Sequence, residues 1–115
     1  MKTIFVLDDD QDQAELLAQA LSAESRRVRA FSDPIRALAA LNADGTDLLV
    51  ADLSMPWIDG GSVVASARVK RPELKVIIVS GLESGADVAR EHRVPFFSKP
   101  VDLSALRKAA AEALD

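Results

Sequence analysis

Short runs of consecutive apolar residues alternate along this chain with longer stretches in which apolar residues recur every three or four positions. The first pattern is typical of strands buried on both faces of a sheet, and the second of amphipathic helices. The predicted strands are residues 3–7, 28–31, 48–51, 76–79 and 95–97. The predicted helices are residues 12–21, 34–43, 62–70, 86–91 and 103–114. This strict alternation predicts an α/β fold, a doubly wound five-stranded parallel sheet with helices on both faces.

Turn and cap residues mark the ends of several predicted elements. Asp33 followed by Pro34 predicts a helix start, and Asp102 caps the last helix in the same way. Gly45 stops the second helix. Pro95 has no backbone N–H, so it belongs at the start of a strand or at a sheet edge.

Composition narrows the class of protein. A chain of 115 residues without a linker or repeat is expected to form one domain over residues 1–115. It has no cysteine, which fits a reducing cytoplasm. No apolar run approaches the roughly 20 residues of a membrane span, so no membrane association is expected. A net charge of -4 argues against general nucleic-acid binding.

Polar residues follow four of the predicted strands. Three aspartates at residues 8–10 end the first strand, Asp52 ends the third, Ser80 ends the fourth, and the fifth leads to Lys99. Singly, such residues are more often turn formers, caps or solvated side chains. Because parallel strands deliver their carboxyl ends to one rim, where α/β folds bind ligands, together they predict a site.

Clustered carboxylates favour a bound cation. Two like charges ~4 Å apart repel by about 4 kcal/mol at an effective dielectric near 20. A proton or a cation relieves this cost, and hard oxygen ligands favour Mg²⁺. A carboxylate can also attack phosphorus to form an acyl phosphate, with metal and lysine stabilising the charge.

These motifs resemble the receiver domains of bacterial two-component response regulators, over essentially the whole chain. The matching segments are residues 4–9, 47–60, 76–81 and 96–100, which read IFVLDD, DLLVADLSMPWIDG, VIIVSG and FFSKP. The resemblance implies the flavodoxin-like (βα)5 fold and a regulatory role rather than that of an enzyme. A single-domain cytoplasmic regulator is expected, because no output module follows Asp115. Its partners would be a histidine kinase or phosphotransfer protein and a downstream protein target.

The resemblance also implies a role for each site residue. Asp52 would be phosphorylated. Mg²⁺ would be held by Asp8, Asp9, Asp52 and the backbone carbonyl of Ser54. Ser80 and Lys99 would contact the phosphoryl group, and Ser80 with Phe96 would form the conformational switch.

Some positions depart from the family pattern or have no assigned role. The segment between Ser80 and Lys99, which includes the fourth helix and its usual partner-docking face, is shorter than is usual in this family. Trp57 is expected either at a partner contact or packed on the third helix. Asp10 extends the acidic rim or caps the first helix, and His92 is expected at the surface.

Three alternatives remain open. The chain could be a receiver fragment of a larger transcription factor or hybrid kinase. It could be a Mg²⁺-dependent aspartyl-phosphate phosphatase, whose two aspartates would match the spacing of Asp8 and Asp10. It could also be a pseudo-receiver that only binds partners, although Asp9, Asp52, Ser80 and Lys99 are all present.

Overall fold

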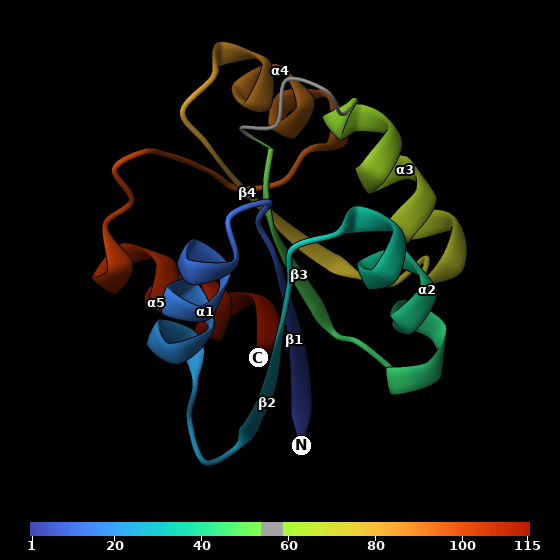
Figure 1. Ribbon diagram of the computed structural model, residues 1–115, viewed down its shortest axis with the longest axis vertical. Helices are drawn as coiled ribbons and strands as arrows, with labels where there is room; N and C mark the ends of the chain where they lie inside the picture. Colours follow the sequence, from blue (N-terminus) through green and yellow to red (C-terminus); the bar gives the residue numbers. More distant parts are fainter. Residues whose placement is uncertain (54–58) are drawn as a thin grey trace.

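The computed structural model describes residues 1–53 and 59–115, which form a single five-stranded sheet flanked by helices (Figure 1). All neighbouring strands are parallel, and their order is β2-β1-β3-β4-β5. The strands are β1 (Lys2–Leu7), β2 (Arg26–Phe31), β3 (Leu48–Asp52), β4 (Lys75–Ser80) and β5 (Phe96–Ser98). The helices are α1 (Gln11–Leu21), α2 (Pro34–Asp44), α3 (Gly60–Lys70), α4 (Glu83–His92) and α5 (Leu103–Leu114). The predicted doubly wound parallel fold is confirmed.

Two hydrophobic layers enclose the sheet. Helices α1 and α5 cover one face, and α2, α3 and α4 cover the other (Figure 1). Along β1, Phe5 and Leu7 point to the second layer, whereas Ile4 and Val6 point to the first. Because both faces of the strand are buried, its sequence is a continuous apolar run rather than an alternating one. None of the helices in the described ranges has the length and apolarity that a membrane span needs.

Aspartate side chains start four of the five helices. Asp10, Asp33, Asp59 and Asp102 each accept hydrogen bonds from backbone N–H groups of the first turn. Such a cap typically stabilises a helix by about 1 kcal/mol. The predicted caps at Asp33 and Asp102 are confirmed, and Asp10 takes the capping role that was one of its two predicted roles. Gly45, in the left-handed region with φ 60°, ends α2 as predicted.

Several predicted element bounds were wrong by a few residues. Cap geometry starts α1 one residue and α3 two residues earlier than predicted, after Asp10 and Asp59. Helix α4 begins at Glu83 rather than residue 86, because its first turn packs closely on the end of β4 at Gly85. Strand β2 begins at Arg26, which pairs with Lys2 of β1. Strand β5 begins one residue after Pro95, whose carbonyl still accepts from the Ile78 N–H at 3.0 Å.

Backbone hydrogen bonds bring the carboxyl ends of the strands to one rim. The Asp8 N–H donates to the Phe31 carbonyl at 3.0 Å, and the Leu53 N–H to the Val79 carbonyl at 2.9 Å. The Lys99 N–H donates to the carbonyl of Ser80 at 3.1 Å. The chain reverses its winding direction between β1 and β3, and a ligand site is expected at such a switch point.

Candidate functional site

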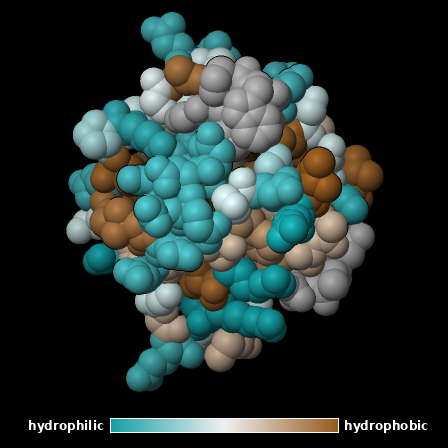
Figure 2. Space-filling view, in the orientation of Figure 1, coloured by the Kyte–Doolittle hydropathy of each residue, from teal (hydrophilic) through white to brown (hydrophobic). Residues whose placement is uncertain are grey.

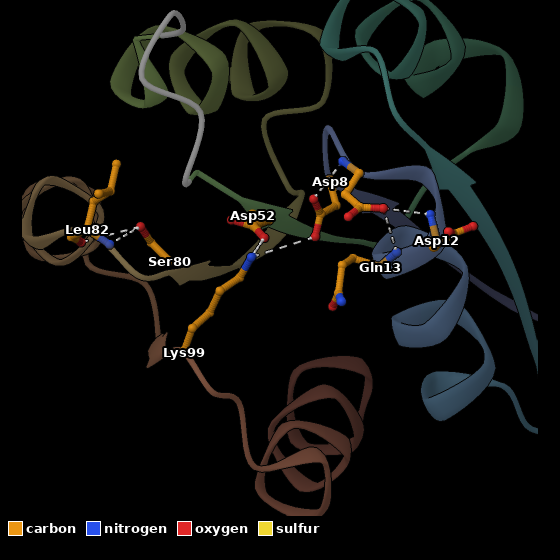
Figure 3. Close-up of polar contacts among 8 residues, drawn as sticks. Asp8, Asp12, Gln13, Asp52, Ser80, Leu82 and Lys99 are labelled. Carbon is orange, nitrogen blue, oxygen red and sulfur yellow. Dashed lines mark hydrogen bonds and ion pairs between the residues drawn. The ribbon is translucent and has the colours of Figure 1, made fainter.

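The carboxylate of Asp52, at the end of β3, forms an ion pair with the ammonium group of Lys99. Lys99 reaches across the rim from the residue after β5 (Figure 3). The Asp52 side chain is only 1% exposed, whereas that of Lys99 is 35% exposed. Desolvation alone would lower the pKa of Lys99, but hydrogen bonding to Asp52 and the negative charges of Asp52, Asp8 and Asp9 outweigh it and raise that pKa. Lys99 is therefore charged at neutral pH and compensates the buried carboxylate.

Asp8, the residue after β1, is the second buried carboxyl group. Its Oδ1 accepts from the Asp10 N–H at 3.0 Å, and its Oδ2 lies 4.0 Å from the Lys99 Nζ. Oδ2 is buried and has no hydrogen-bond donor among the described residues. Burial is the main cause that raises the pKa of Asp8, followed by hydrogen bonding to the Asp52 side chain, to a value of about 7. One ammonium group thus faces two buried carboxyl groups, and Asp8 relieves the excess charge by holding a proton near neutral pH.

Asp9 and Asp10 do not enter this buried pair. Both are exposed, and Asp10 caps α1 through the N–H groups of Asp12 and Gln13 (Figure 3). Within residues 1–53 and 59–115, no three acidic or histidine side chains are already arranged around a metal position. The structure therefore brings together Asp8, Asp52 and Lys99 of the predicted site and leaves Asp9 facing solvent.

Ser80, at the end of β4, has its hydroxyl directed away from Asp52. Its Oγ accepts from the Leu82 N–H at 2.9 Å and donates to the Leu82 carbonyl at 3.3 Å. Figure 3 shows both bonds on the side of Ser80 that is remote from Lys99. Ser80 is buried, and Phe96 is half-buried against the same hydrophobic layer as α4. The two predicted switch residues therefore lie together beneath the first turn of α4.

The remaining predicted positions are Ser54, Trp57 and His92. The carbonyl of Ser54 and the side chain of Trp57 lie outside the described residues. His92, the last residue of α4, is only half-buried, and its carbonyl accepts from Arg68 at 3.0 Å.

A groove that the sequence did not reveal opens beside Lys99. Its volume is about 590 Å³, and it is formed by α1, the end of β4 and the connection from β5 to α5. Leu16, 49% exposed on α1, lines the groove together with Lys99 and Val101. Figure 2 shows hydrophilic side chains over the amino end of α1 and hydrophobic surface beside them, on the side where α5 lies in Figure 1. The only sequence signal was a leucine on the polar side of the first helix.

Comparison with known proteins decides the family. The model of the response regulator receiver domain family matches residues 4–111. This chain belongs to the response regulator receiver domain family. Receiver domains are regulatory parts of two-component systems rather than enzymes with external substrates.

Curated relatives of this receiver domain differ in length. It is 27% identical over 114 residues to the C4-dicarboxylate transport transcriptional regulatory protein DctD of Rhizobium meliloti (strain 1021). That alignment covers 96% of this chain and 25% of DctD, so this receiver domain spans about a quarter of that relative. It is 31% identical over 108 residues to the response regulator receiver protein CpdR of Brucella abortus (strain 2308), covering 90% of this chain and 88% of CpdR.

A solved structure supports the same fold. A CheY-like response regulator receiver domain protein from Methanospirillum hungatei JF-1 superimposes with a TM-score of 0.87 at 26% identity. The match covers 100% of this receiver domain and 94% of that chain.

Proposed function

We propose that residues 1–115 act in the cytoplasm as a phosphoacceptor domain of a phosphorelay, with Asp52 as the acceptor. The observation that carries this proposal is the buried ion pair between Asp52 and Lys99 at the sheet's switch point. A carboxylate that is almost fully buried and paired with a cation has the form that a nucleophile at phosphorus requires. Membership in the receiver family supports the same assignment.

The reaction transfers one phosphoryl group. An Asp52 oxygen forms a bond to phosphorus while the bond from phosphorus to the donor nitrogen of a phosphohistidine breaks, and that nitrogen keeps the electron pair. Lys99, already paired with Asp52, is placed to neutralise the phosphoryl oxygens that gather there. The protein needs to contribute little covalent chemistry, because positioning and charge stabilisation dominate phosphoryl transfer.

A divalent cation fits this donor set. Among the described residues, no hydrogen-bond donor reaches the buried Oδ2 of Asp8, and the pKa of Asp8 is raised, both signs of an undercompensated acidic site. Mg²⁺ commonly takes one or two carboxylates and keeps several waters. Asp8, Asp52, the carbonyl of Ser54 and, after it turns inward, Asp9 would hold it. When bound, it would supply positive charge to the carboxylates and phosphoryl oxygens.

The rival assignment makes Asp8 the nucleophile, as in an aspartyl-phosphate phosphatase. The raised pKa of Asp8, about 7, leaves much of this group protonated at neutral pH without a cation. A protonated carboxyl is a poor nucleophile, and the ammonium group of Lys99 pairs with Asp52 rather than with Asp8, whose Oδ2 lies 4.0 Å from the Lys99 Nζ. The charge distribution therefore favours Asp52.

Treatment of the protein with acetyl phosphate and Mg²⁺ tests this function. We expect a single phosphoryl adduct by intact mass, and none when the metal is chelated. A folded protein that forms no adduct with metal present would be a pseudo-receiver. Hydrolysis of an external phosphoester would instead support the phosphatase.

Signal output is proposed to pass through Ser80 and Phe96 to a downstream protein. Ser80 must leave Leu82 to reach a phosphoryl group on Asp52, and Phe96 lies in the adjoining layer under α4. Such coupling is a shift between two populations of one fold. The full-length relatives that are transcriptional regulators also fit a receiver within a larger protein.

The groove beside Lys99 is the proposed contact for a protein phosphodonor. A donor must bring its phosphohistidine to the rim, and the groove offers apolar surface next to the residue paired with Asp52. Replacing Leu16 by aspartate is expected to slow transfer from a kinase or phosphotransfer protein by about 10-fold or more, typical of losing one apolar anchor. Acetyl phosphate, which needs no docking, should react with the variant at the wild-type rate.

The matched control is Ile35→Asp, which places the same charge on a leucine-sized residue that is 75% exposed on α2. Both variants should react equally with acetyl phosphate. If Ile35→Asp slowed protein-dependent transfer as much as Leu16→Asp, added negative charge rather than the groove would be responsible.

A further inference from the structure

The first turn of α4 lies directly against Ser80 because residue 85 is a glycine. Gly85 is buried, and a Cβ built there would overlap the Ser80 Cβ. It would also lie 2.7 Å from the Ser80 Oγ and 3.3 Å from Cε1 of Phe96. The Ser80 Cβ is fixed to the backbone of β4, so rotation of the side chain cannot relieve this overlap. Any larger residue must move α4 away from the end of β4.

The same turn of α4 depends on Ser80 for its anchoring. The other four helices begin with an aspartate whose side chain accepts from the first turn. The N-cap residue of α4, Leu82, has no side-chain cap, and its own backbone N–H donates to the Ser80 hydroxyl. The Ser80 hydroxyl therefore takes part in fixing the start of α4 while it bonds Leu82.

We propose that Gly85 is a positioning residue that seats α4 on Ser80 and thereby holds the Ser80 hydroxyl away from Asp52. This inference rests on the proposed function, in which Ser80 turns toward a phosphoryl group on Asp52. The close packing of α4 on Ser80 stabilises the arrangement in which the Ser80 hydroxyl bonds Leu82. Glycine at residue 85 thus sets the fraction of unphosphorylated protein in which the Ser80 hydroxyl is already free to turn toward Asp52.

A methyl group at residue 85 acts as a wedge between the first turn of α4 and Ser80. It pushes α4 from Ser80, lengthens both Ser80–Leu82 bonds and frees the hydroxyl. When the state with the freed Ser80 hydroxyl is more populated, the apparent affinity for a ligand that binds this state rises by the same factor. A purely structural role for Gly85 predicts the reverse, because a disturbed fold would bind the ligand less well.

The test is a titration of Gly85→Ala and wild-type protein with beryllofluoride, a stand-in for the phosphoryl group, at fixed Mg²⁺. We expect half-saturation of Gly85→Ala at a several-fold lower beryllofluoride concentration. We also expect the Leu82 amide resonance of the untreated variant to lie toward its position in beryllofluoride-bound wild type. Equal or weaker binding by Gly85→Ala would overturn the inference.

Gly61→Ala is the matched control. Gly61 also lies in the first turn of a helix, but among the residues that the structure describes, a Cβ there meets only the exposed Asp59 carboxylate, at 3.3 Å. Both alanines bring the same gain in helix propensity. Binding by Gly61→Ala should therefore equal wild type, and a similar gain in both variants would show that helix propensity, not the wedge, tightens binding.

Two further measurements keep the outcomes distinct. If Gly85→Ala does not fold, the test is instead the hydrogen exchange of the Leu82 amide in wild-type protein. Loss of its protection when beryllofluoride is added supports the inference. Unchanged exchange overturns the inference. Wild-type protein that neither forms the acetyl phosphate adduct nor binds beryllofluoride would refute the proposed function itself. Wild-type binding together with weaker binding by Gly85→Ala would refute only the role of Gly85.

Discussion

Replacing Asp52 by asparagine is expected to eliminate the phosphoryl adduct that forms with acetyl phosphate and Mg²⁺. Asparagine has nearly the same shape but lacks the negative charge that attacks phosphorus and pairs with Lys99. Removing a nucleophile typically lowers the rate by on the order of 10³-fold or more. The adduct should therefore be undetectable by intact mass over a reaction time that phosphorylates the wild-type protein completely.

The control for this loss is Asp59→Asn. Asp59 is exposed and caps α3 through the N–H groups of Gly61 and Ser62, and asparagine caps a helix about as well. This variant loses the same charge and should keep the adduct. An adduct that persists in Asp52→Asn but disappears in Asp8→Asn would move the nucleophile to Asp8 and favour the phosphatase alternative.

The sequence was sufficient to predict that Asp8, Asp52, Ser80 and Lys99 share one rim. This inference needs only the order of the strands and the rule that parallel strands end at the same edge. The aspartate caps were likewise predictable at Asp33 and Asp102, because a cap is a local interaction between neighbours in the chain.

Side-chain direction was not predictable from the sequence. Whether Ser80 bonds Leu82 or faces Asp52, and whether Asp9 points inward, depends on rotamers that the strand pattern does not determine. The role of Gly85 was missed for a related reason. In the sequence Gly85 only precedes the predicted helix at residues 86–91, and its meaning depends on how closely α4 approaches Ser80.

Removing the charge of Asp8 is expected to stabilise the metal-free protein. The pKa of Asp8 is about 7 in the folded protein, against 3.8 for an ordinary aspartate. Between these values the folded state holds a proton that the unfolded state has released, so this group lowers the free energy of unfolding as pH rises toward 7. Asp8→Asn should therefore raise that free energy by roughly 2–4 kcal/mol at pH 8, since each tenfold change in proton affinity corresponds to about 1.4 kcal/mol.

The gain should fall as pH is lowered from 7 and be largely lost near pH 4, where wild-type Asp8 is protonated in the folded state and is becoming protonated in the unfolded state as well. Urea unfolding at pH 8 and at pH 4–5, with a metal chelator present, measures both values. Mg²⁺ should then stabilise wild-type protein at pH 8 more than it stabilises Asp8→Asn, because a proposed ligand is missing from the variant.

Asp9→Asn tests whether the stabilisation expected for Asp8→Asn comes from the burial of Asp8 or from the loss of one negative charge. It removes the same charge one residue later, but Asp9 is exposed, so the metal-free stability should change by less than about 0.5 kcal/mol. Its Mg²⁺-dependent stabilisation should still fall, because Asp9 belongs to the proposed ligand set. If both variants stabilised the metal-free protein equally, general charge repulsion would explain the gain. The buried position of Asp8 opposite Asp52 would then carry no special energetic cost, and a cation at this rim would relieve none.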